Sequence, residues 1–61
     1  MENNWFVIKV FNKETDTLKR VEVALKETLK SHLSKINHEE EAYFIIRCDV
    51  NKMISLVRKY N

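Results

Sequence analysis

The sequence contains no glycine and no proline, and its only cysteine is Cys48. Without glycine there is no glycine-rich loop to hold a phosphate and no dinucleotide-binding fingerprint. A single cysteine excludes an intramolecular disulfide, and neither histidine stands at the paired spacing of a zinc site. We therefore expect no metal and no other cofactor. The turns must be formed by asparagine, aspartate, serine and threonine instead.

The sequence also lacks a long apolar run and a strong excess of one charge. Its longest apolar run covers residues 42–46, far short of the roughly 20 residues that span a bilayer. The net charge is only +2, which does not indicate a polyanionic partner. The first residues, MENNWF, carry no basic region of a signal peptide, so we expect a cytoplasmic protein that does not bind membranes.

The length of 61 residues predicts one small α+β domain covering residues 1–61. A chain of this length buries only about 60% of its unfolded surface, so its stability is expected to be low. Because neither a disulfide nor a metal is available, stability must come from an efficient core or from association with a partner.

Short patterned segments follow one another along the chain. Aromatic and β-branched residues predict strands, and apolar residues three and four positions apart predict helices. The predicted order is strand 5–11, strand 18–24, helix 25–37, strand 42–49 and a last helix capped by Asp49. Asn37 suits the left-handed position that ends a helix, in the place of a missing glycine.

The segment after the first strand has a second interpretation. Leu18, Val21, Leu25 and the later leucines also recur at helical spacing, so one long helix from Thr17 to Ile36 would give a βαβα fold. The sequence Val-Glu-Val is a poor helix centre, and two strands rarely form an independent sheet. These two points favour the hairpin.

The connections then define a topology. A hairpin followed by a helical crossover places the third strand beside the first, giving a three-stranded antiparallel sheet of order 2-1-3. We expect both helices on one face of this sheet, so that the ββαβα chain forms a small sandwich with one open face.

Side-chain alternation assigns residues to that open face. Lys9 and Arg47 are taken to mark it, because charged side chains avoid the core. The expected binding surface is Trp5, Val7, Lys9, Phe11, Arg20, Tyr43, Ile45 and Arg47. The expected core from the same strands is Phe6, Ile8, Val10, Phe44, Ile46 and Cys48.

Such an apolar and basic face has three interpretations. The favoured one is a contact with a protein partner or a second copy, because aromatic residues and arginine are enriched in interface hot spots. The alternative is single-stranded nucleic acid, with bases stacked on the aromatic rings. The third is that the strands are buried on both sides by other parts of the chain.

No residue pattern indicates catalysis. Cys48 and His32 are interpreted as packed or half-exposed side chains rather than as nucleophile or base. The run Glu39, Glu40 and Glu41 is interpreted mainly as a solvated turn that protects a strand from aggregation, and secondarily as an acidic contact for a basic partner. We therefore expect a non-enzymatic binding module, a small regulator or inhibitor of the kind that phages and mobile elements encode.

Overall fold

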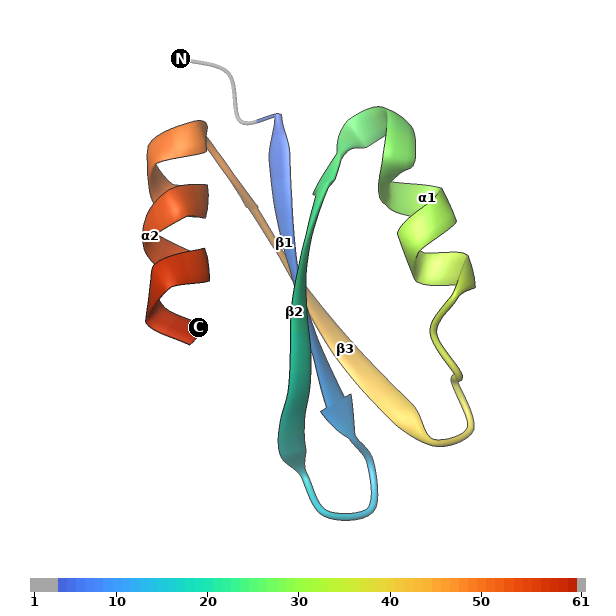
Figure 1. Cartoon of the computed structure of the whole chain (residues 1–61). Coiled ribbons are helices and arrows are strands. Elements are labelled where there is room, and N and C mark those ends of the chain that lie inside the picture. Colours follow the sequence, from blue (N-terminus) through green and yellow to red (C-terminus); the bar gives the residue numbers. More distant parts are fainter. Residues whose placement is uncertain (1–3, 61) are drawn as a thin grey trace.

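A computed structural model describes residues 4–60 and contains three strands and two helices (Figure 1). The elements are β1 (Trp5–Asn12), β2 (Thr17–Leu25), α1 (Lys26–Ser34), β3 (Glu41–Cys48) and α2 (Val50–Tyr60). The predicted α+β class and element order are confirmed. Because Thr17–Leu25 is a strand, the alternative with one long first helix is wrong.

The strands form one sheet in the order β2-β1-β3, with both neighbouring pairs antiparallel, as the connections predicted. The turn between β1 and β2 shows how the chain manages without glycine. The Asn12 side-chain oxygen accepts hydrogen bonds from the backbone N–H groups of Glu14 and Thr15, at 2.9 and 3.1 Å. Asp16 takes the left-handed conformation, with φ of 57°, which aspartate tolerates better than most residues.

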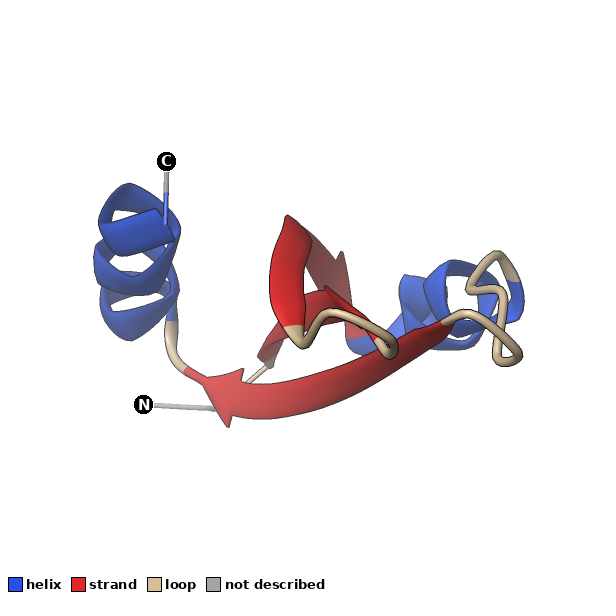
Figure 2. Ribbon diagram, turned by 90° about the horizontal axis from the view of Figure 1, so that it is seen from below, coloured by secondary structure: helices blue, strands red, loops and turns tan. Residues whose placement is uncertain are grey.

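The two helices lie on opposite faces of the sheet (Figures 1 and 2). Leu29 and Leu33 of α1 pack against the cluster that contains Ile8. Tyr60 of α2 instead accepts a hydrogen bond of 3.2 Å from the Nζ atom of Lys9. Consecutive residues of a strand point to opposite faces, so the two contacts cannot share one. The expected sandwich with both helices on one face is therefore not the arrangement found.

The composition of β1 accounts for this arrangement. Val7 and Ile8 are neighbours, and both are 0% exposed, so the central strand is buried on both of its faces. The connection from β2 to β3 places α1 over one face, and α2 covers β1 and β2 on the other. An almost continuous apolar strand such as WFVIKVF is typical of a strand with two covered faces.

The helices are short and only partly covered. The Asp49 carboxylate accepts the backbone N–H of Lys52 at 2.8 Å, so the predicted cap of α2 is confirmed. The helix α1 ends at Lys35 with φ of −87°, and Asp16 is the only residue with positive φ in the described part of the chain. The predicted left-handed conformation at Asn37 is therefore wrong. No residue of either helix is fully buried.

The helices described between residues 4 and 60 are not long and apolar enough to cross a membrane. The molecule is a thin slab of 37 × 24 × 12 Å. With so little depth, much of the apolar surface stays near solvent, and the places where it remains exposed are the first candidates for a binding site.

Candidate functional site

The predicted binding surface is divided between the two faces of the sheet. Lys9 pairs with Phe44 across the sheet, and Phe6 pairs with Arg47, so Lys9 and Arg47 point in opposite directions. The face that carries α2 holds Trp5, Val7, Lys9 and Phe11. The face that carries α1 holds Arg20, Tyr43, Ile45 and Arg47. The structure brings these residues together in two groups of four.

The group beside α2 is mostly covered. Val7 is fully buried, and Trp5 and Lys9 are half-buried. The Lys9 ammonium lies 5.0 Å from the centre of the Tyr60 ring and also donates to its hydroxyl. Phe11 lies further along β1, half-buried, with its ring against Phe44 at a centroid distance of 5.7 Å. Phe11 therefore lies beside the most exposed aromatic ring of the sheet.

The group beside α1 is partly engaged in other contacts. Arg20 takes part in ion pairs, and the Arg47 guanidinium lies 5.9 Å from the centre of the Phe6 ring. Tyr43 packs against the core cluster and meets the His38 ring edge to face. Ile45 is 38% exposed and is the more exposed of the two residues of this group that carry no charge.

Six large apolar side chains of the described residues are 38% or more exposed, and they are Phe44 and Ile45 on β3, Leu18 and Leu25 on β2, and Val50 and Ile54 on α2. Phe44 is 63% exposed and its neighbour Ile45 is 38% exposed, on opposite faces of the strand. Both helices pack mainly against β1 and β2, and Phe44 and Ile45 of β3 remain exposed. We call Phe44 and Ile45, with the flanking Phe11 and Tyr43, the β3 surface. The expectation that Phe44 lies in the core is wrong, because Phe44 is 63% exposed and α2 packs mainly against β1 and β2.

A chain of ion pairs lies on the face of the sheet that carries α1. Glu41, at the start of β3, binds the Arg20 guanidinium at 2.9 Å and the Lys19 ammonium at 2.7 Å. Arg20 also donates to Glu22 at 2.8 Å, and the other oxygen of Glu22 lies 2.7 Å from Nδ1 of His32. These five residues tie β2, α1 and β3 together.

The charged groups of this network shift one another's pKa values. Hydrogen bonds from Arg20, Lys19 and the Asn37 backbone lower the pKa of Glu41 from 4.5 to about 2. The contacts with His32 and Arg20 lower the pKa of Glu22, and the bonds to Glu41 and Glu22 raise the pKa of Arg20. This network was not predicted from the sequence. The signal was the charged alternation Arg20 and Glu22 on a strand whose partner helix carries a histidine.

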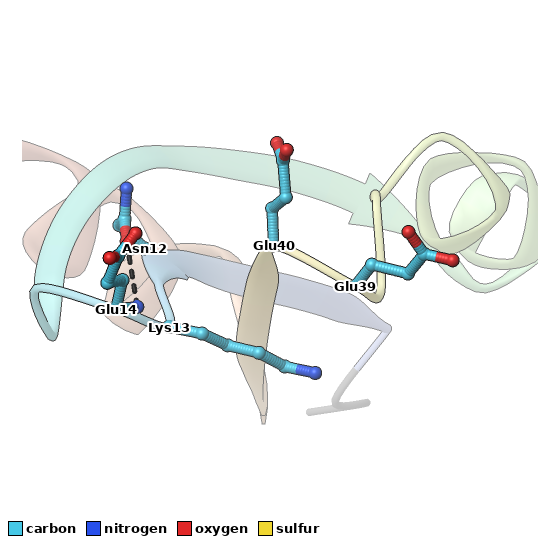
Figure 3. Close-up of a pocket in the computed structure, with 5 residues that line it drawn as sticks. All are labelled: Asn12, Lys13, Glu14, Glu39 and Glu40. Carbon is cyan, nitrogen blue, oxygen red and sulfur yellow. Dashed lines mark hydrogen bonds between the residues drawn. The ribbon is translucent and has the colours of Figure 1, made fainter.

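The acidic run is not one surface. The Glu41 side chain is only 6% exposed and serves the ion pairs, whereas Glu39 and Glu40 are exposed. Glu39 and Glu40 help to line a shallow hollow of about 300 Å³ (Figure 3), together with Asn12, Lys13 and Glu14 of the turn after β1. The Lys13 ammonium donates to the His38 carbonyl and so holds the two loops together.

The described residues hold no group of histidine, cysteine and acidic side chains that could bind a metal ion. Cys48 is buried, and burial raises the pKa of its thiol, which is the opposite of what a nucleophile needs. No known protein family, characterised protein or solved structure matches this chain. The β3 surface is therefore the candidate site with the clearest physical signature.

Proposed function

We propose that this chain is a non-enzymatic protein-binding module that contacts its partner through the β3 surface, and that it acts as a small regulator or inhibitor. The observation that carries the proposal is the exposure of two neighbouring apolar residues of β3, with Phe44, 63% exposed, on one face of the strand and Ile45, 38% exposed, on the other. Large apolar side chains that gather at one place on a small domain are typical of interaction sites.

The chemistry of this surface supports a protein partner. Aromatic rings supply much of the energy of protein interfaces, and the edge-to-face pair of Phe11 and Phe44 presents such a group already ordered. A thin domain also gains stability from covering more apolar area. Three members of the β3 surface, Phe11, Tyr43 and Ile45, belong to the surface that the sequence predicted.

Single-stranded nucleic acid is less well supported. A nucleic-acid platform needs aromatic rings and basic side chains on one face. Here Lys9 donates to Tyr60, and Arg20 is paired with two glutamates. Lys9 and Arg47 are on opposite faces, so no single face combines both of these cations with the exposed rings.

The proposal is tested by affinity capture from the native cell, with and without nuclease. The variants are Ile45→Ala and, as a matched control, Leu18→Ala, because both side chains are 38% exposed and lie on opposite edge strands. We expect a protein to be captured whether or not nuclease is added. Its capture should be lost with Ile45→Ala and retained with Leu18→Ala. Capture that disappears with nuclease, or that ignores Ile45→Ala, contradicts the proposal.

A further inference from the structure

The pairing of β3 with β1 determines which backbone groups of β3 point outward, away from β1. The N–H of Lys13 donates to the carbonyl of Glu40 at 2.9 Å, which makes these two residues a hydrogen-bonded pair of the β1–β3 ladder. Such pairs alternate along antiparallel strands, so Ala42, Phe44 and the next even-numbered residues bond to β1. The odd-numbered residues between them turn their N–H and C=O groups outward.

The chain itself uses one of these outward groups and leaves a short stretch for others. The N–H of Glu41 donates to the Asn37 carbonyl at 2.8 Å. Tyr43 and Ile45, in the middle of β3, point their backbone groups away from β1. No other strand of the described chain pairs with that edge (Figure 2).

The exposed side chains show from which direction a partner approaches. Phe44 and Ile45 point to opposite faces, and both are exposed. A partner that lies flat on one face covers only one of them. A partner strand that extends the sheet at its edge brings side chains to both faces at once. The pattern therefore fits strand addition at β3.

The two edge strands differ in how open they are to such addition. The β2 edge is interrupted by a register shift opposite Val10 and Phe11, and it carries Lys19, Arg20 and Glu22. Bulges and charges of this kind protect an edge from pairing. The β3 edge keeps one register with β1 over its whole length and is apolar in its centre.

We propose that β3 pairs antiparallel with β3 of a second copy of this chain, which joins two three-stranded sheets into one continuous sheet. The proposal rests on the proposed function, because it names the partner of the β3 surface. The two-fold axis passes beside Phe44, so that Phe44 faces Phe44 of the second copy. Tyr43 then forms a hydrogen-bonded pair with Ile45 of the second copy, and Ile45 with Tyr43 of the second copy.

The distribution of charge favours antiparallel pairing of the two copies. The exposed Glu39 and Glu40 precede β3, and the exposed Arg47 lies near the end of the strand, so antiparallel pairing sets the acidic end of one copy against the basic end of the other. A shift of one copy by two residues in either direction removes the contact between the two Phe44 rings.

Amide hydrogen exchange on the wild-type chain tests the pairing. The amides of Tyr43 and Ile45 should exchange about tenfold more slowly when the protein concentration rises to 100 times the dissociation constant, because most molecules are then paired. The amide of Phe44 bonds to β1 in either state and is the internal reference. Exchange at Tyr43 and Ile45 that does not depend on concentration, in a chain that sedimentation equilibrium shows to be monomeric, overturns the proposal.

A pair of lysine substitutions shows whether the edge is the correct one. Ile45→Lys places a charge in the proposed interface, whereas Leu18→Lys places the same charge at an equally exposed position of the other edge strand. We expect dimers to be lost only with Ile45→Lys, with circular dichroism unchanged in both. Dimers that survive Ile45→Lys overturn the proposal. If that variant does not fold, the exchange measurement on the wild type still decides.

A disulfide reports the register. With oxidised glutathione as the oxidant, Phe44→Cys should cross-link to a second copy, because residues opposite each other in a non-hydrogen-bonded pair bring their Cβ atoms within bonding range. Leu18→Cys should not cross-link, and the native Cys48 is buried. Preferential cross-linking of Ile45→Cys would show a different register and overturn this one.

The inference and the proposed function fail in different ways. If the chain is strictly monomeric but its capture of another protein still depends on Ile45, the second copy is not the partner and the proposed function still holds. If the chain is monomeric and capture does not depend on Ile45, both the dimer and the proposed function are contradicted.

Discussion

The rings of Phe11 and Phe44 meet edge to face at 88°, although the two residues lie on different strands and differ in exposure. Lys9, two residues before Phe11 on β1, donates to Tyr60, the last residue of α2. Phe11 lies one step further along the same face, so the aromatic pair stands beyond the cover that α2 provides. This position explains why a sheet with a helix on each face still exposes aromatic surface.

The first prediction separates the core from the β3 surface. Ile8→Ala removes a fully buried side chain and should lower the free energy of unfolding by about 2–5 kcal/mol. Phe44→Ala removes a side chain that is 63% exposed and should cost about 1 kcal/mol or less, mainly the contact with Phe11. Urea unfolding followed by circular dichroism measures both. A loss for Phe44→Ala that equals the loss for Ile8→Ala would place Phe44 in the core.

The element order could be predicted from the sequence because each element is defined by a local pattern. The strand WFVIKVF and the cap at Asp49 are both defined by neighbouring residues. The order β2-β1-β3 then follows from the hairpin and the crossover. No long-range information is needed for these steps.

The faces could not be predicted in the same way. Alternation shows which residues of one strand share a face, but it does not relate the phase of one strand to that of another. Lys9 and Arg47 were taken to mark one open face, and the register places them on two. Long basic side chains keep their charges near solvent even on a covered face, as Lys9 does beside Tyr60, so they are weak markers of an open face. The two-sided apolar character of β1 was the better signal.

The second prediction concerns acid. The folded pKa of Glu41 is about 2, below its ordinary value of 4.5, so its contribution to stability is complete above pH 4.5 and is lost as the pH falls towards about 2. The lowered pKa of Glu22 acts in the same direction. The urea midpoint should therefore fall across this window.

Glu41→Gln and Glu39→Gln form the matched pair for this experiment. Glu41→Gln breaks the pairs with Arg20 and Lys19, so it should lower stability at neutral pH and reduce the further loss in acid. Glu39 is exposed, so Glu39→Gln should resemble the wild type at every pH. Equal pH profiles for the two variants would contradict the role of Glu41.

The third prediction concerns the cap of α2. Asp49→Ala removes the acceptor of the Lys52 N–H and should cost about 1 kcal/mol of stability. Asn51→Ala, at an exposed position in the first turn of the same helix, should change stability by less than about 0.5 kcal/mol. Thermal unfolding of the two variants side by side measures the difference, and equal melting temperatures would argue against the cap.

The fourth prediction concerns the contact that holds the end of α2. The hydrogen bond from Lys9 lowers the pKa of the Tyr60 hydroxyl below its ordinary value of 10. In a Tyr43→Phe background, ultraviolet titration reports Tyr60 alone, because the chain has only two tyrosines. The Lys9→Met substitution should raise the Tyr60 pKa, and an unchanged titration would show that the contact does not persist in solution.

The last prediction compares the two kinds of partner through the same surface. If the partner is a protein, Tyr43→Ala and Phe44→Ala should each weaken binding by about 2 kcal/mol, because the central contacts of such an interface are apolar. Lys9→Met should then matter little, since Lys9 is engaged with Tyr60 on the covered face. Moderate changes in salt should have a small effect for the same reason.

Nucleic acid would give the opposite pattern. The phosphate backbone dominates such binding, so affinity would fall steeply with salt, and Lys9→Met and Arg47→Met would weaken it at least as much as the aromatic variants. Isothermal titration at two salt concentrations distinguishes the patterns. Because Phe44 is largely exposed, Phe44→Ala should keep the circular dichroism of the wild type, and its loss of binding then reports the contact itself. The division of Lys9 and Arg47 between two faces leads us to expect the protein pattern.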